Sequence, residues 1–483
     1  MLMASNVMWT LVFLAGVLVI YYRMPLQIRW GILLLASLIF YMSVDPLMVL
    51  FVGGSALWSW FTGRKIEESQ RMMQKRGWLL GCVLPLLGIL FFFKYFGFFA
   101  DAVLSLLHQI GIPADPKTVK LVLPMGISYY TFKIISYVAD IYQGKRKSES
   151  HVGYYLTYVL FFPQILSGPI ERSQGFLEQM HKGLSYDADL FAEGLQRIVL
   201  GLFKKLVIAN RLSAYVNAVF GAPQNYPGLA ALLAAFFYSF QIYCDFSGYS
   251  DIAVGMGNLC GIRSRKNFDC PYFARNIKDF WNRWHISLSG WLRDYVYIPL
   301  GGNRVSPIRH KWNLLLTFLV SGIWHGENWT FLIWGGIHGI WNLCSRKKED
   351  TAGIGRKIRQ TLCTFVGVTF AWIFFRAESV GAAFAYLRHM LFDFSLSFAD
   401  VQNSILPFTG DNTCAAYFLT LCLLLLLLFL YEWSRMYGKG KERAGEGACG
   451  EGFSLSTLWL VLMTGSVLLF GVFGASGFLY AQF

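Results

Sequence analysis

Long apolar runs recur along the whole sequence, and they constrain the fold more than any other feature. Each run has about 15–20 residues, the length at which a helix crosses a bilayer. Between the runs, charged residues make up only 14% of the 483 residues, against about 25% in ordinary soluble proteins. So little polar sequence cannot cover the apolar residues of a soluble globule. The sequence therefore predicts an all-α, polytopic membrane protein and excludes soluble, disordered and fibrous classes.

We expect about ten to twelve transmembrane or re-entrant helices from these runs. The expected spans are 7–22, 29–43, 46–61, 77–99, 121–142, 152–168, 229–262, 313–342, 361–376, 415–432 and 454–480. Residues 186–212 are instead amphipathic, which predicts a helix lying at the membrane surface.

The basic residues are clustered between the apolar runs, and they account for the net charge of +14. The clusters lie at 64–76, 145–147, 346–348 and 435–443. Clusters that flank membrane spans mark cytoplasmic loops and attract anionic lipids. We therefore expect membrane lipid, and no nucleic acid, as a partner. The first span has no preceding positive charge and is followed by Arg23, so we expect an uncleaved anchor whose N-terminus faces outside.

His325 is the first candidate catalytic residue, because ionisable side chains inside a membrane protein are costly and tend to be functional. It lies in the middle of the apolar stretch 313–342, after Trp324 and before Gly326. Basic residues flank both ends of this stretch, so it forms either a hairpin with His325 near its apex or one long tilted helix. Either arrangement keeps the imidazole neutral and able to accept a proton. We expect Gly326 to leave room beside the ring; the alternative is a histidine that only bonds to a neighbouring helix.

His285 is the second candidate, in the motif Trp-Asn-Arg-Trp-His-Ile-Ser. Asn282, Arg283 and Ser287 supply polar groups that could orient or bind a substrate. Trp284 belongs to the aromatic residues of the same motif. The alternative for His285 is an interfacial histidine among aromatic anchors.

Asp245 and Asp251 form a third candidate group inside the apolar stretch 229–262. Two carboxylates could bind a cation, relay protons or pair with arginine. Six residues correspond to about 600° on a helix, so the two carboxylates do not share a face. The favoured interpretation is that both are buried partners of the charged residues at 275–293.

No other known catalytic or cofactor motif is present. The sequence has no nucleophile elbow, no P-loop, no GxGxxG run and no metal-ligand spacing. Two prolines and a glycine in 162–172 predict either a broken helix that lines a cavity or an ordinary helix-ending turn. If the protein is an enzyme, direct transfer with a histidine base fits better than a covalent intermediate.

Six stretches of this sequence resemble the membrane-bound O-acyltransferase (MBOAT) family, in its bacterial alginate O-acetyltransferase-like and D-alanyl transferase-like branch. The stretches are 123–132, 162–172, 201–205, 243–256, 267–304 and 322–341. The resemblance implies an enclosed helical fold with a central funnel or tunnel. It also places His325 on the family's catalytic histidine and His285 on the second active-site histidine. Asn282 stands where many relatives have a second arginine.

The resemblance implies an O-acyltransferase in a bacterial inner membrane, acting on an exported polysaccharide. No bound cofactor is expected; the acyl donor would be acetyl-CoA or an acyl-carrier protein, and an extracytoplasmic acetyltransferase would be the partner. We divide the single membrane domain into N-terminal helices (1–120), a catalytic core (121–345) and C-terminal helices (346–483). The alternatives are D-alanyl transfer to teichoic acid and, outside enzymes, a transporter of a polymer or lipid intermediate.

Overall fold

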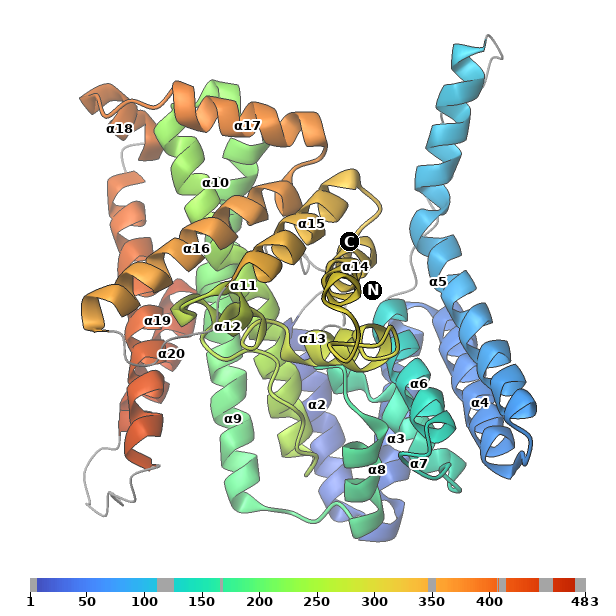
Figure 1. The fold of residues 1–483 in the computed structure, drawn as a ribbon. Coiled ribbons are helices and arrows are strands. Elements are labelled where there is room, and N and C mark those ends of the chain that lie inside the picture. Colours follow the sequence, from blue (N-terminus) through green and yellow to red (C-terminus); the bar gives the residue numbers. More distant parts are fainter. Residues whose placement is uncertain are drawn as a thin grey trace.

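The computed structural model describes residues 7–110, 126–165, 168–345, 353–405, 407, 414–442 and 455–473. Within these ranges the chain is helical and contains no β-strand, which confirms the all-α prediction. Figure 1 shows α4 and α5 at one edge of the molecule, α19 and α20 at the opposite edge, and α12–α15 between them. The start of the expected span 121–142 and the basic cluster 346–348 lie outside the described residues.

The N-terminal helices form one side of the bundle. They are α2 (Val7–Arg23), η1 (Leu26–Ile28), α3 (Arg29–Val44), α4 (Pro46–Glu68) and α5 (Met72–Gln109). The sequence Asp45-Pro46 starts α4 because the Asp45 carboxylate accepts a hydrogen bond from the Leu47 amide and proline suits the first helical position. α4 packs against α5 and α6.

The middle of the chain builds a column of helices around α11. Its elements are α6 (Ile127–Tyr142), α7 (Val152–Leu160), η2 (Phe162–Gln164), α8 (Ser173–Lys182), α9 (Ala188–Leu202), the π-helical η3 (Phe203–Ala209), α10 (Asn210–Gly221), η4 (Pro223–Asn225) and α11 (Gly228–Leu259). α9 and α11 approach closely because glycines face each other across the contact. A Cβ atom on Gly201 would lie 2.5 Å from the Gly248 carbonyl oxygen.

The next elements lie at the centre of the molecule. They are η5 (Pro271–Phe273), α12 (Ile277–Trp281), α13 (Ile286–Leu292), the π-helical η6 (Arg293–Tyr297), α14 (Pro307–His325) and α15 (Trp329–Cys344). α14 and α15 pack along each other as a hairpin, which confirms the hairpin interpretation of 313–342. A Cβ atom on Gly322 would lie 2.4 Å from the Phe331 carbonyl oxygen, so only glycine permits this contact.

The C-terminal helices complete the bundle on the side of α11. They are α16 (Ile354–Arg376), α17 (Val380–Phe392), α18 (Phe398–Ile405), α19 (Cys414–Glu442) and α20 (Leu455–Phe470). α16, α17 and α18 contact α11, while α20 contacts α9 and η3. Helix contacts therefore cross both boundaries of the expected segments: α16 packs on α11 across the boundary at 345, and α4 packs on α6 across the boundary at 120. The division into three segments stays a prediction.

Five helices of the described chain are long and apolar enough to cross a membrane. They are Leu26–Ser43, Met72–Gly97, Gly228–Leu259, Ile354–Arg376 and Ala415–Met436. Two shorter apolar helices, Val7–Arg23 and Thr457–Phe470, accompany them. Together they make this a multi-pass membrane protein.

Two expected elements differ in the structure. Among its described residues, the expected span 152–168 contains the nine-residue α7 and the three-residue η2. The backbone leaves the α-helix at Phe161, two residues before Pro163. The expected surface helix at 186–212 is instead part of a helical column, α9–η3–α10, that packs along α11. Its polar residues Lys204 and Lys205 are buried against α11 rather than solvated.

Candidate active site

His325 is the last residue of α14 and lies beside the apex of the α14–α15 hairpin. Only 4% of its surface is exposed. Aromatic rings surround the imidazole: the ring centres of Trp324, Trp334 and Phe375 lie 4.8, 5.0 and 5.2 Å away. The expectation that Gly326 leaves room beside this imidazole is wrong. The space of the missing side chain is filled by the Phe331 ring, which a Cβ atom on Gly326 would approach to 2.0 Å.

His285 precedes α13 in a left-handed backbone conformation, with a φ of 41°. Side chains other than glycine seldom adopt this region, so surrounding bonds must hold it. Asn267 provides them. Its backbone oxygen accepts from the Ile286 amide at 2.9 Å, and its side-chain Oδ1 accepts from the Ser287 amide at 3.2 Å and hydroxyl at 2.8 Å. Asn267 was not singled out by the sequence, where a lone asparagine before an aromatic residue carries no signal.

The same Asn267 oxygen fixes the proton on the His285 ring. Oδ1 lies 3.1 Å from Nδ1 of His285, and it must act as an acceptor because the Ser287 amide donates to it. Nδ1 therefore carries the proton and Nε2 carries the lone pair in the neutral ring. Nε2 is buried and has no hydrogen-bond partner among the described residues. His285 lies outside the candidate membrane-spanning helices, and burial lowers its pKa to about 3, so the ring is neutral at physiological pH.

The structure brings the two predicted histidines together. The Trp324 ring centre lies 6.1 Å from that of His285 and 4.8 Å from that of His325. The two imidazoles are also close enough to influence each other's charge. Trp324 therefore lies close to both imidazole rings, and its supporting role stays a prediction.

A cavity of about 500 Å³ lies beside the segments that carry these histidines, although neither histidine lines it. Asn282 and Ser287 line it, and so does Ser321, one helical turn before His325. The cavity has a strongly cationic wall with a single carboxylate, Asp294. Its cations are Arg172, Arg265, Lys266, Lys278 and Arg293. Arg172 comes from the broken segment 162–172, which supports the cavity-lining interpretation of that segment.

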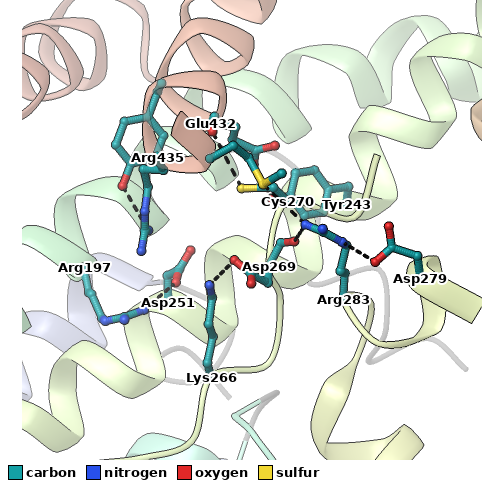
Figure 2. A network of polar contacts seen from close by, with 12 residues as sticks. Arg197, Tyr243, Asp251, Lys266, Asp269, Cys270, Asp279, Arg283, Glu432 and Arg435 are labelled. Atoms are coloured by element: carbon teal, nitrogen blue, oxygen red, sulfur yellow. Dashed lines mark hydrogen bonds and ion pairs between the residues drawn. The ribbon is translucent and has the colours of Figure 1, made fainter. Parts of the chain in front are cut away.

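Two residues of the His285 motif face elsewhere. Arg283 forms an ion pair with Asp279 at 2.9 Å and donates to the Asp269 carbonyl at 3.2 Å, as Figure 2 shows. Trp284 is fully buried, with the rings of Phe268 and Trp372 5.1 and 5.0 Å from its own. Neither Arg283 nor Trp284 lines the cavity, so both act as supports of the fold around His285.

Asp245 and Asp251 are buried partners of cations, but the cations differ from those expected. Asp245 pairs with Lys205 at 2.5 Å. Asp251 pairs with Lys204 at 2.8 Å and with Arg197 at 3.3 Å. The expected partners at 275–293 are wrong because α9 and η3 pack along α11 at these positions. The two carboxylates are therefore not brought to the histidines.

His338 is a third buried histidine that the sequence interpretation did not include. It lies on α15, with the Trp334 ring centre 5.0 Å and the Trp281 ring centre 5.1 Å away. Neither of its ring nitrogens has a hydrogen-bond partner among the described residues. The sequence signal that could have identified His338 is its position within the apolar stretch 313–342, where ionisable side chains are rare. Within the described ranges, no three His, Cys, Asp or Glu side chains are grouped so that they could hold a metal ion.

The site is thus a buried histidine pair beside a cavity with a cationic wall, in a multi-pass helical protein. A sequence model of the membrane-bound O-acyltransferase family matches residues 150–346, the part of the chain that carries both histidines. Similarity to individual family proteins extends over most or all of the chain. The chain belongs to the membrane-bound O-acyltransferase family and is an acyltransferase, which confirms the resemblance seen in its motifs.

Three individual relatives show which members of the family this chain is similar to. Probable alginate O-acetylase AlgI of Pseudomonas putida is 35% identical over 495 residues, which cover all of both chains. Peptidoglycan O-acetyltransferase of Helicobacter pylori is 36% identical over 394 residues, 74% of this chain and 73% of the relative. Teichoic acid D-alanyltransferase of Bacillus subtilis is 34% identical over 232 residues, 46% of this chain and 58% of the relative.

Proposed function

We propose that this protein is a bacterial inner-membrane O-acetyltransferase that moves an acetyl group from a cytoplasmic donor toward an exported polysaccharide. The observation that carries the proposal is the cationic cavity beside the segments that hold His285 and His325. The names of two relatives, an alginate O-acetylase and a peptidoglycan O-acetyltransferase, support the acetyl group and the polysaccharide acceptor.

The charge of the cavity favours a phosphate-bearing donor such as acetyl-CoA. Arg172 and Arg293 share Asp294, and Lys266 pairs with Asp269, so five cations face two carboxylates. The excess positive charge attracts an anion, and arginine binds phosphate groups through paired N–H donors. The hydroxyls of Ser287, Ser289 and Ser321 line the same cavity and offer neutral hydrogen bonds. A donor held by its phosphates at the cationic wall would extend its thioester toward the histidines.

In the proposed reaction His325 acts as the general base. The neutral imidazole takes the proton of the acceptor hydroxyl while that oxygen attacks the thioester carbonyl, so a C–O bond forms. The C–S bond then breaks, and the leaving thiolate receives the proton from the imidazolium. General-base assistance of this kind contributes about 10²–10⁴-fold in rate. His285, with its Nε2 lone pair available, would accept a hydrogen bond from the acceptor or the leaving thiol.

D-alanyl transfer is the second candidate function, because a teichoic acid D-alanyltransferase is 34% identical over 232 residues, 46% of this chain. It would require an acyl-carrier protein as the donor in place of acetyl-CoA. For the favoured function we propose that an extracytoplasmic acetyltransferase receives the acetyl group, with the membrane lipid as the surrounding partner.

The two functions are separated by a donor experiment on the full-length protein in nanodiscs. Labelled acetyl-CoA and a D-alanylated carrier protein are supplied separately, and transfer of the label to glycan acceptors or water is measured. We expect turnover of acetyl-CoA that His325→Ala abolishes. Turnover of the carrier protein alone would overturn acetyl transfer in favour of D-alanyl transfer, and turnover of neither would contradict both donors.

A further inference from the structure

A second cavity lies apart from the histidines, between α9, α19 and α20. Its volume is about 360 Å³. Arg197 lines it from α9, Arg435 from α19 and Trp459 from α20. The acyl-transfer reaction proposed above uses none of these residues.

Arg435 is the cation in this cavity that forms no direct ion pair with the described residues, although Asp251 lies close enough to interact with its charge. Its guanidinium donates to the Tyr431 hydroxyl at 3.3 Å, and no carboxylate of the described residues forms an ion pair with it. A guanidinium has five N–H donors, so most of its bonding capacity is unused. Arg197, by contrast, is paired with Glu193 at 3.0 Å and with Asp251 at 3.3 Å. Figure 2 shows Arg435 reaching from α19 toward Asp251, which Arg197 contacts from α9.

Trp459 supplies a second donor without an acceptor. Its indole Nε1 is buried and has no hydrogen-bond partner among the described residues, although it lines the same cavity. A buried N–H without an acceptor costs about 1–3 kcal/mol. A ligand with anionic oxygens would satisfy both Arg435 and this indole.

The remaining walls combine polar residues, namely Glu193, Gln196 and Ser434, with apolar ones from the membrane helices. Glu193 is the one carboxylate among the lining residues, and it is paired with Arg197. Leu200, Leu460 and Met463 line the cavity, and Arg435 is in the candidate span Ala415–Met436. The same end of α19 carries Lys439 and Lys441, and such basic ends face the cytoplasm. A ligand at this place therefore combines an anionic head with apolar chains, in the leaflet where anionic lipids are concentrated.

We propose that the cavity between α9, α19 and α20 binds the phosphate headgroup of an anionic phospholipid. Arg435 and the Trp459 indole donate hydrogen bonds to the phosphate oxygens, and the acyl chains lie along Leu460 and Met463. The bound lipid connects α19 and α20 to α9, so it stabilises the folded protein in proportion to its affinity.

The test uses the full-length protein in a neutral detergent. Native mass spectrometry and thermal unfolding are recorded with added phosphatidylglycerol, phosphatidylcholine or inorganic phosphate. We expect phosphatidylglycerol alone to bind and to raise the Tm. If phosphatidylcholine or inorganic phosphate bound and raised the Tm as much as phosphatidylglycerol does, the assignment of an anionic phospholipid to this cavity would be overturned.

Two variants and one control make the test specific to the cavity. Arg435→Gln removes the charge and should weaken phosphatidylglycerol binding about tenfold. Trp459→Phe keeps the ring and removes only the donor, so it tests the site even if Arg435→Gln does not fold. Arg388→Gln on α17 removes the same charge from an exposed position and should bind as the unaltered protein does. Unchanged lipid affinity in Trp459→Phe and in folded Arg435→Gln would overturn the proposal.

Discussion

The ammonium group of Lys94, on α5, donates a hydrogen bond to the backbone carbonyl of Trp324, the residue before His325. The neighbouring Tyr95 hydroxyl donates to the carbonyl of Ile323. Carbonyl groups at the end of a helix have no partner within the helix, and a cation there also offsets the negative end of the helix dipole. α5 therefore holds the end of α14 that carries the catalytic candidate.

Replacing Lys94 by methionine should change how activity depends on pH. Lys94, His285 and His338 all oppose protonation of His325. Without the ammonium charge, His325 holds its proton to higher pH, and a protonated base is inactive. The acid limb of kcat/KM should therefore move to higher pH. Lys94→Arg keeps the positive charge, so the acid limb of kcat/KM should stay at the same pH.

Tyr95→Phe is the matched control for this charge effect, because it removes a hydrogen bond to α14 without removing a charge. It should lower activity without moving the acid limb. If Lys94→Met left the limb unmoved, or if Tyr95→Phe moved it equally, Lys94 would have no electrostatic effect on His325.

Asn267→Ala should reduce acyl transfer about 10–100-fold, because a hydrogen-bond partner that fixes the tautomer and orientation of a functional histidine contributes about that much. The alanine removes the oxygen that bonds both Nδ1 of His285 and Ser287. Asn267→Asp restores an acceptor at that place and should recover part of the activity. Steady-state kinetics of the two variants check this; equal losses in both would show that the oxygen does not orient the ring.

Arg265→Gln should raise the KM for acetyl-CoA several-fold and change kcat little, because Arg265 lines the cavity away from the reacting groups. The loss should shrink at high salt, since ions screen exposed charges. Lys311→Gln, at the exposed start of α14, serves as the control. A fall in kcat at unchanged KM would place Arg265 outside donor binding.

Lys205→Met should destabilise the protein by about 3 kcal/mol or more, because it leaves the buried Asp245 without its lysine. The double variant Lys205→Met/Asp245→Asn should recover much of this loss, since both charges are then absent. Thermal unfolding in detergent measures each step of the cycle. Additive losses in the double variant would show that the two side chains do not interact.

The sequence was sufficient to predict the part of the site that one element forms. The apolar stretch 313–342, with basic residues at both ends, predicts either a hairpin with His325 near its apex or one long tilted helix. The structure has the hairpin, with His325 beside its apex. The partners of Asp245 were not predictable, because they depend on which face of α9 packs on α11. Lys94 could have been found: it is the lone cation in the apolar run 77–99, and the cost of burying a charge there marks it.

The central claim is that His325 is the base of acetyl transfer to an exported polysaccharide. Its most direct test is the O-acetyl content of the exported glycan in cells that carry His325→Ala, at the membrane abundance of the unaltered protein. His310→Gln, at the other end of the same helix, is the control. We predict that His325→Ala lowers the rate of acetylation about 10²–10⁴-fold while the control retains it. Acetylation at the unaltered level in cells with stably inserted His325→Ala protein would contradict the account.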